Sequence, residues 1–567
     1  MSEFDKEYPP LKKEEAPIYN FHHDLIELYL NLCRKTDKSA IKKIYTCFRN
    51  AIQRVIDDET IDEPKRKEHL LLLYKLIAQT RDITYGKGEK FITYVLIAAW
   101  YTFYPVSACF ALKTLVTNHD NDDDLFSPYG SWCDMKYFCG YVNEANYIDN
   151  DDKTKLIDTA IGLLNHQINK DRMSWNNTLK DFLEEKMNNP ATFSQRPIGK
   201  DVMTFAVKWC PRENSKYGWL YELLVLQWTK MFSPNVKYET EAEFSVCKRN
   251  YRKMISALNK ELQTPQVKQC ANRWSDINPD DVSIGTLVKQ KRAFSKADNI
   301  DRSECREHFN EYYDDMNAVR NYKQNTNRTI IPLSKIVSYA MKYIEDGVEN
   351  EKQKTWINSI WKKNMNHVTK SKLNNSVPII DISWDLDKDS RNSAIGLGIA
   401  VAIKSDINRI ILYDNVSYWI TITPDEDFTS IISKIYNKTQ TATSSNIDSA
   451  LSLVLEAFDS TASPETKNDM VFFIFNGGKD INLSIQKRFH SSTFIYWNIQ
   501  RTGYLKYKHI HTSPGKFHLC GNSITDINNI QKYFIDRFKS GDLGNYIINL
   551  LNNPRYKVLE KCLIDIM

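Results

Sequence analysis

The stretch that decides the fold is Ser376–Asp389, which reads SVPIIDISWDLDKD. Its first residues are mainly apolar and β-branched, which is typical of a strand buried on both faces of a parallel sheet. Carboxylate and hydroxyl side chains follow, and the next apolar stretch, Ser393–Ile403, is predicted to be a buried helix. Open α/β sheets bind ligands at this kind of loop, outside the carboxyl ends of their strands.

Strands and helices alternate after this point. We expect strands at Val377–Ile380, Arg409–Leu412, Ser417–Ile422, Met470–Phe475, Thr493–Asn498 and Gly515–Leu519. We expect helices at Ser393–Ile403, Asp427–Tyr436, Ile447–Phe458 and Ile527–Phe538. The alternation predicts a doubly wound, Rossmann-like α/β domain over residues 376–567. The last segment, 543–564, either returns to the sheet edge as a strand or packs back on the preceding helical part.

Residues 17–373 show helical periodicity nearly throughout. Apolar residues recur at helical spacing in 25–32, 41–55 and 70–77, and the prolines fall mostly between such stretches. Many helices of similar length predict an α-solenoid or stacked helical pairs. Residues 1–16 are charged and are expected to form a flexible tail. A chain of 567 residues exceeds what one core accommodates, which agrees with several domains.

The composition is that of an ordinary globular protein, with 42% hydrophobic and 26% charged residues. The net charge of +5 is small, so charge alone does not demand a nucleic-acid partner. Eleven cysteines without a Cys-x-x-Cys pair favour reduced thiols over zinc fingers or a disulfide framework. The start of the chain is charged, and the longest mainly apolar run, Phe91–Trp100, is too short to cross a bilayer. We therefore expect a soluble, cytoplasmic protein with no membrane partner.

Three loops at the expected carboxyl edge of the sheet carry oxygen-bearing side chains. The first holds Asp381, Ser383 and Asp385, the second Ser445 just before a helix, and the third Asn476-Gly477. This set resembles the metal site of von Willebrand factor A domains, whose first loop reads Asp-x-Ser-x-Ser. The resemblance implies Mg²⁺ bound by Asp381, Ser383, Asp385 and Ser445. Gly477 replaces the family's third-loop aspartate, so the alternative is a degenerate site closed by hydrogen bonds.

A series of different short motifs also lies along most of the chain. They are Arg81-Asp82, Gly86–Lys90, Tyr129–Asp134, Ala206–Arg212, Tyr251–Lys253, Cys270–Ile277, Ile331–Leu333, Phe494–Asn498 and Leu519–Ser523. This ordered set resembles an uncharacterised family of giant viruses, fungi, plants and bacteria that is related to the Ro ribonucleoprotein. That protein joins a helical TROVE module to a von Willebrand A domain. The resemblance implies a HEAT-like helical ring or horseshoe with the A domain at its end, in the cytoplasm or in a virion.

In the Ro protein the hole of the ring binds single-stranded RNA ends and the outer surface binds structured RNA. The resemblance therefore implies an RNA partner. Basic residues near aromatic ones suit this role. The candidates for RNA binding are Lys87, Lys90, Lys208, Arg212, Lys248, Arg249, Arg252, Lys253, Arg273, Lys289 and Arg292, with Lys291 beside the last two. Lys87 and Lys90 open a helix, whose free N–H groups favour phosphate. Each of these residues is alternatively an ordinary solvated cation on a helix face.

Signatures of enzymes are missing from the sequence, which has neither a phosphate loop nor a Gly-x-Ser-x-Gly elbow. We therefore predict a non-enzymatic RNA-binding protein. The alternative is a protein–protein scaffold, or a viral structural or assembly component, that acts through the A domain. An RNA-processing enzyme with a dispersed site is a third and weaker alternative.

Overall fold

The structure is a computed structural model of the chain. It describes residues 20–117, 127–188, 196–318, 331–347, 350–366, 373–423, 425–461, 470–477, 492–501, 516–521 and 543–564, and also residues 368, 489, 503, 504, 524, 526–528 and 530. The predicted tail, 1–16, lies outside these residues, as does most of the helix expected at Ile527–Phe538.

Helices occupy the chain up to residue 365. They are α1 (Phe21–Asn31), α2 (Lys38–Asp57), α3 (Glu63–Arg81), α4 (Lys90–Tyr101), α5 (Pro105–Thr114), α6 (Cys133–Glu144), α7 (Asn150–Asn188), α8 (Ala206–Trp209), α9 (Gly218–Phe232), α10 (Glu241–Glu261), α11 (Pro265–Cys270), α12 (Ile284–Lys289), α13 (Lys291–Phe294), α14 (Ile300–Ala318), α15 (Leu333–Glu345) and α16 (Glu351–Met365). Several begin at a side chain that caps their free N–H groups, such as Asp37 at α2 and Asp62 at α3. At α10, Thr240 and Glu243 form a capping box.

A six-stranded sheet follows the helical region. Its strands are β1 (Ser376–Asp381), β2 (Arg409–Tyr413), β3 (Ser417–Thr421), β4 (Val471–Asn476), β5 (Thr493–Asn498) and β6 (Lys516–Cys520). The other elements of this region are α17 (Lys388–Lys404), α18 (Phe428–Gln440), α19 (Ile447–Thr461), α22 (Leu543–Leu551) and α23 (Val558–Ile564). The strand order is β3-β2-β1-β4-β5-β6, and β3 alone is antiparallel to its neighbour. The coarse prediction of a helical region followed by an α/β region is therefore confirmed.

The central strands β1 and β4 are buried on both faces of the sheet, as their mainly apolar sequences require, whereas the edge strand β3 is only partly buried. One face, with Ile380, Phe475 and Trp497, belongs to the core that continues into α17 and the N-terminal helices. The opposite face, with Ile379 and Ile474, packs on α19 in a separate core. Gly398 lets α17 approach β1 closely, because a Cβ there would lie 2.3 Å from Cδ1 of Ile380.

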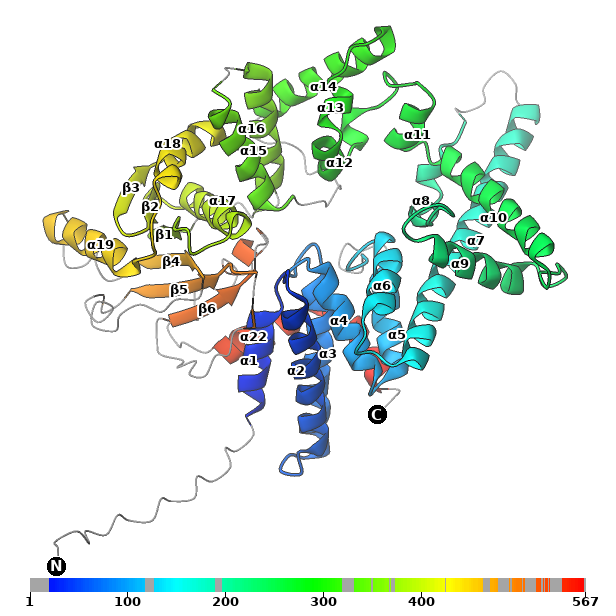
Figure 1. The fold of residues 1–567 in the computed structure, drawn as a ribbon, viewed down its shortest axis with the longest axis horizontal. Coiled ribbons are helices and arrows are strands. Elements are labelled where there is room, and N and C mark those ends of the chain that lie inside the picture. Colours follow the sequence, from blue (N-terminus) through cyan, green and yellow to red (C-terminus); the bar gives the residue numbers. More distant parts are fainter. Residues whose placement is uncertain are drawn as a thin grey trace, which may run out of the picture.

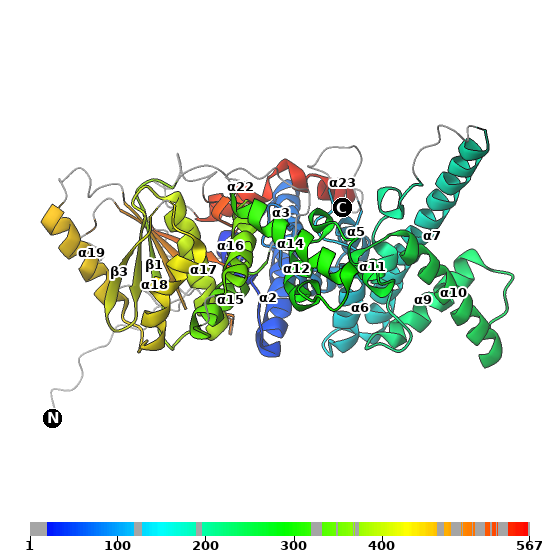
Figure 2. The same ribbon diagram turned by 90° about the horizontal axis from the view of Figure 1, so that it is seen from above.

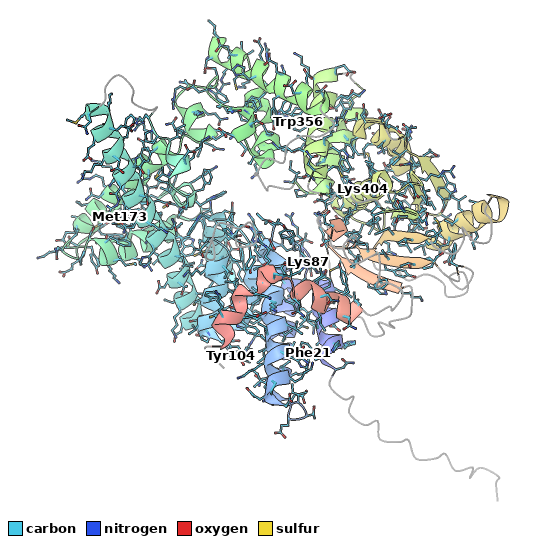
Figure 3. All side chains as sticks on the ribbon, turned by 180° about the vertical axis from the view of Figure 1, so that it is seen from behind. Phe21, Lys87, Tyr104, Met173, Trp356 and Lys404 are labelled. Atoms are coloured by element: carbon cyan, nitrogen blue, oxygen red, sulfur yellow. The ribbon has the colours of Figure 1, made fainter. Side chains whose placement is uncertain are left out.

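The elements follow one another around an open centre (Figure 1). The described side chains leave this centre open as well (Figure 3). Seen from above, the sheet lies at one end of the molecule and α7 and α10 lie at the other (Figure 2). The circuit closes because β6 packs on α1, while α15 and α16, which precede the sheet, pack on its helices α17 and α18.

Polar contacts hold the seam where the circuit closes. This seam lies between the end of the sheet and α1 with the residues that follow α1. The Thr36 N–H donates to the carbonyl of Arg501 at 3.1 Å, and the Gly503 N–H donates to Asp37 at 3.3 Å. The Arg501 guanidinium is buried and donates to Asp389 at 2.7 Å and to Ser334 at 3.4 Å. Arg501 therefore joins α15, α17 and the N-terminal region.

The C-terminal helices pack back on the start of the chain. Helix α22 lies against α1 and α3, and α23 lies against α3 and α5. Arg555, between these two helices, forms a fully buried ion pair with Asp82 through contacts of 2.6 and 3.0 Å. Of the two placements that the sequence left open for residues 543–564, packing on the helical part is the one observed.

Candidate functional site

The residues predicted to bind metal meet at the carboxyl edge of the sheet. Asp381 ends β1 and accepts hydrogen bonds from the Ser383 N–H and from Ser445 Oγ, both at 2.9 Å. The Ser445 N–H donates to Asp385 at 3.3 Å. The structure therefore brings together all four predicted residues, from the loop after β1 and the loop before α19. We call this set the sheet-edge site.

Two residues of the sheet-edge site were not predicted. Tyr413 ends β2 in register with Asp381 and is fully buried, and its hydroxyl lies beside Asp381, Ser445 and Asn476. The Arg391 guanidinium, on α17, donates to the Ile382 carbonyl at 3.3 Å and lies near Asp381. Tyr413 could have been found from its position, because it is the last residue of the strand that neighbours β1.

One buried oxygen at this site lacks a hydrogen-bond partner. Among the described residues, Ser383 Oγ has none, whereas the buried Tyr413 hydroxyl interacts with Asp381, Ser445 and Asn476. Burial and the charge of Asp381 raise the pKa of Tyr413 well above its usual value, so the phenol is neutral. Asp381, Ser383, Ser445 and Tyr413 thus form a buried network that is closed mainly by its own hydrogen bonds.

The residues present fit a resident Mg²⁺ ion poorly. Mg²⁺ requires six oxygens in a nearly ideal octahedron. Ser445 Oγ is committed to Asp381, Gly477 supplies no carboxylate, and Arg391 already places a positive charge near Asp381. Within the part of the chain that the structure describes, no group of three or more His, Cys, Asp or Glu residues could hold a metal ion.

A second candidate site combines cations and aromatic rings on α4, α6, α8 and the start of α9. The Lys136 amine lies 4.9 Å from the ring centre of Tyr137, 5.0 Å from that of Trp209 and 5.6 Å from that of Tyr217. The Lys90 amine lies 5.5 Å from the Tyr137 ring, and the Lys208 amine lies 5.6 Å from the ring of Phe205, a residue that is 47% exposed. We call these seven residues the cation–aromatic patch.

The local sequence explains how the patch forms. Gly140 on α6 lets the Tyr217 ring approach, since a Cβ at that position would lie 2.7 Å from Cε1 of Tyr217. Burial lowers the pKa of both Lys136 and Lys208, and the rings around Lys136 supply no charge to offset this. In Figure 1, α8 and one end of α6 border the open centre of the ring.

The sequence identified this patch only in part. Lys90, Lys208 and Trp209 were singled out, whereas Lys136 and Tyr217 were missed because nothing in their sequence neighbourhood links them to Trp209. The Lys90 amine also contacts Cys133 Sγ at 3.0 Å. Arg212 follows the patch in sequence and is exposed.

Lys87 is not accessible to RNA. It is 3% exposed, and its amine donates to the Tyr29 carbonyl and contacts Cys520 Sγ at 3.2 Å, next to the seam (Figure 3). The interpretation of Lys87 as a phosphate ligand is therefore wrong. The residue instead ties α1 to β6, and its amine lies 3.7 Å from the centre of the Tyr29 ring.

Other predicted RNA-binding residues have acidic neighbours. Lys248 pairs with Glu213 and Glu222 at 3.5 and 3.6 Å, and Arg252 pairs with Glu213 at 3.2 Å. Arg273 pairs with Asp276 at 3.4 Å. The Lys291 amine lies 3.8 Å from the Trp356 ring, and burial lowers its pKa to about 8. The remaining predicted residues are exposed: Arg249, Lys253, Lys289 and Arg292.

Several motifs of the ordered set meet in one buried network. Arg81 pairs with Asp134 at 2.9 Å, while Asp82 pairs with Arg555. Burial alone would raise the pKa of Asp134, but the Arg81 guanidinium outweighs it and holds that pKa below its usual value. The Tyr129 hydroxyl donates to the Arg555 carbonyl at 2.8 Å. These motifs therefore have a structural role that joins both ends of the described chain.

Comparisons with known proteins reveal a distant relative. No family model matches the chain. The chain is 22% identical over 409 residues to an uncharacterized protein of Acanthamoeba polyphaga mimivirus, across 70% of this chain and 63% of the relative. The chain thus matches less than two thirds of that relative's length. None of the helices in the described residues is long and apolar enough to cross a membrane.

Proposed function

We propose that the protein binds single-stranded RNA, without catalysing a reaction, through the cation–aromatic patch. The observation that carries this proposal is the placement of the Lys136 amine among the rings of Tyr137, Trp209 and Tyr217, with Lys90 and Lys208 beside them. Sequence-tolerant binding of single strands combines cations for the phosphates with aromatic side chains for the bases.

The lysine amines of the patch suit this role because they are not already paired with carboxylates among the described residues. Among the described residues, Lys90, Lys136 and Lys208 form no ion pair with a carboxylate, whereas Lys248 and Arg252 both pair with Glu213. The negative charge of a bound phosphate would favour the protonated amines and so offset the desolvation that lowers the pKa of Lys136 and Lys208. The exposed Phe205 ring offers a face on which a base can stack.

Replacement of Lys136 and Lys208 by glutamine tests the proposal. We expect the double variant to bind a fluorescein-labelled oligouridine about tenfold or more weakly, because two phosphate contacts are lost. The slope of log affinity against log salt should fall in magnitude by about 1.4, the value for two contacts on a single strand. Fluorescence anisotropy at several salt concentrations measures both quantities.

The matched control replaces Lys42 and Lys43, two exposed lysines of α2, by glutamine. This variant removes the same charge at a distance from the patch, so it should change affinity and slope little. Equal losses in the two variants would show that binding follows net charge alone, and the proposal would then fail.

We also propose that the region predicted over residues 376–567 contains a von Willebrand A-like domain and that the preceding helices are HEAT-like repeats, as in the Ro-related family. The strand order supports the first proposal, since 3-2-1-4-5-6 is the doubly wound order and the sheet-edge loops occupy its carboxyl ends. The second is supported by the packing of consecutive helices, with α2 on α3, α3 on α4 and α4 on α5.

A protein scaffold that acts through the sheet-edge site is the second candidate function. The observation that favours it is Trp384, which lies next to this site and is 68% exposed. An exposed tryptophan is unusual on a protein that acts alone, and tryptophan is enriched at the centres of protein interfaces.

A further inference from the structure

Two cysteine thiols meet at the seam of the circuit. Cys33 lies in the connection between α1 and α2, and Cys520 ends β6. Both are free thiols, 2% and 3% exposed, and each is a hydrogen-bond partner of the other. The Cys520 thiol also donates to the Tyr29 carbonyl of α1 at 3.2 Å. The two sulfurs therefore touch at the place where the N-terminal region meets the edge strand of the sheet.

Lysine amines lie beside both thiols. The Lys87 amine contacts Cys520 Sγ at 3.2 Å, and the Lys35 amine is buried beside Cys33. The hydrogen bond from the Cys520 thiol, with both amines, holds the pKa of Cys33 below its usual value, although burial alone would raise it. Burial raises the pKa of Cys520 well above its usual value. The pair thus combines a thiolate with a thiol, which is the arrangement of a nucleophilic cysteine beside a resolving cysteine.

The connection that carries Cys33 is able to admit a small oxidant. Residues 32–37 belong to neither a helix nor a strand, and Arg34 and Thr36 are exposed. A local displacement of this short connection uncovers Cys33 without unfolding a helix, and such openings cost less free energy than global unfolding. Hydrogen peroxide is little larger than water, so it reaches the thiolate through a small opening.

We propose that hydrogen peroxide converts Cys33 and Cys520 into a disulfide that locks the seam closed. The Cys33 thiolate attacks one peroxide oxygen and the O–O bond breaks, which leaves a sulfenic acid on Cys33 and a hydroxide that takes up a proton from solvent. The Cys520 sulfur then attacks the Cys33 sulfur, the S–O bond breaks, and the hydroxide leaves as water with the Cys520 proton. Two sulfurs are oxidised, one peroxide is reduced to two waters, and a thiol reductant restores the thiols by exchange.

The disulfide acts on the same junction as the polar contacts of the seam. Those contacts are hydrogen bonds, such as the one from the Thr36 N–H to the Arg501 carbonyl, and they open locally. A covalent bond between Cys33 and Cys520 removes the arrangements in which α1 and β6 separate. The oxidised protein is therefore restricted to the closed circuit, whereas the reduced protein is free to open at the seam.

Peroxide treatment of the full chain tests this inference. The reduced protein is incubated with hydrogen peroxide, the remaining thiols are alkylated, and the digest is analysed by mass spectrometry without a reductant. We expect a peptide that links Cys33 to Cys520 in most molecules, and dithiothreitol should remove the link. The oxidised protein should unfold several degrees higher than the reduced protein, and hydrogen exchange in residues 32–37 and in β6 should slow at least about threefold.

Variants assign the roles of the two cysteines. Cys520→Ser should stop at a sulfenic acid on Cys33, which dimedone traps, because the resolving thiol is missing. Lys35→Gln should slow formation of the link about threefold or more, because the amine no longer favours the thiolate. The matched control is Cys139→Ser, which removes another buried cysteine and should form the link as fast as the unaltered protein. The thermal midpoint of each reduced variant verifies its fold.

Three outcomes would overturn the inference. The first is the absence of the link after the exposed Cys270 has been oxidised, and the second is a link that forms only in urea. The third is a link that leaves hydrogen exchange at the seam unchanged, because the bond would then not lock the seam. The inference does not rest on RNA binding, since that test concerns α6 and α8, and the two can fail separately.

Discussion

Glu89 occupies the N-cap position of α4, close to Cys33, Arg34 and Lys87. Burial raises the pKa of this carboxyl group to about 7, and the neighbouring Cys33 adds to the rise. The folded protein therefore binds this proton more tightly than the unfolded chain does. The resulting stability is present at acidic pH and is lost as the pH rises from about 4.5 towards 7.

Replacement of Glu89 by glutamine keeps the side chain neutral at every pH. We expect Glu89→Gln to unfold a few degrees higher than the unaltered protein at pH 8 and to lose this advantage near pH 5. Thermal unfolding followed by circular dichroism across this range measures the difference. Glu456→Gln, at an exposed position, should show no such pH dependence, and a constant offset for Glu89→Gln would contradict the assigned pKa.

Individual cations illustrate what the sequence could and could not predict at the candidate sites. Lys87 and Lys90 are three residues apart, yet Lys87 lies before α4 and is buried at the seam, whereas Lys90 begins α4 and lies in the cation–aromatic patch. The burial of Lys87 depends on Tyr29 and Cys520, which are remote in sequence. By contrast, Asp381, Ser383, Asp385 and Ser445 were predictable, because strand ends place such loops at one edge of a sheet.

The ion pair between Asp82 and Arg555 joins the end of α3 to the segment between α22 and α23. Both side chains are fully buried, and the Tyr556 hydroxyl also donates to Asp82 at 3.3 Å. Replacing Arg555 by methionine leaves the Asp82 charge buried without its partner. We expect a loss of about 3–5 kcal/mol in the free energy of unfolding, with a lower thermal midpoint.

A double-mutant cycle separates the ion pair from packing. Asp82→Asn combined with Arg555→Met should destabilise the protein less than the sum of the two single variants, because the double variant leaves no unpaired buried charge. Additive effects would show that the two side chains act independently, contrary to the geometry.

The strands were more predictable than the way the helices associate. Each end of all six expected strands lies within one residue of the observed end, because the strands read as short, mainly apolar runs between polar loops. Periodicity also located most helices. It could not place α22 and α23, because an apolar stripe shows that a helix face is buried but not which partner buries it.

The seam decides whether the molecule is a closed circuit or an open arc. Arg501 is its central residue, since it bonds Asp389, Ser334 and, through its carbonyl, Thr36. We expect Arg501→Met to increase hydrogen exchange in residues 32–37 and in β6, because fewer contacts then hold the sheet against α1. Mass spectrometry locates the change.

Exchange in α9 and α10, at the far side of the ring, is the internal control for this measurement and should stay the same. A uniform increase throughout the chain would indicate global destabilisation rather than opening at the seam. A protein whose exchange at the seam did not change would show that Arg501 is dispensable for closure.

The pairing of Asp82 with Arg555 spans 473 positions of sequence. During synthesis, the carboxylate leaves the ribosome long before its guanidinium partner exists. Until then, the faces of α1, α3 and α5 that α22 and α23 will cover are open to solvent, and the nascent N-terminal helices are exposed to proteases and chaperones. Translation that stops before Arg555 therefore yields a product whose earliest helices remain incomplete, however correctly the intervening sheet has formed.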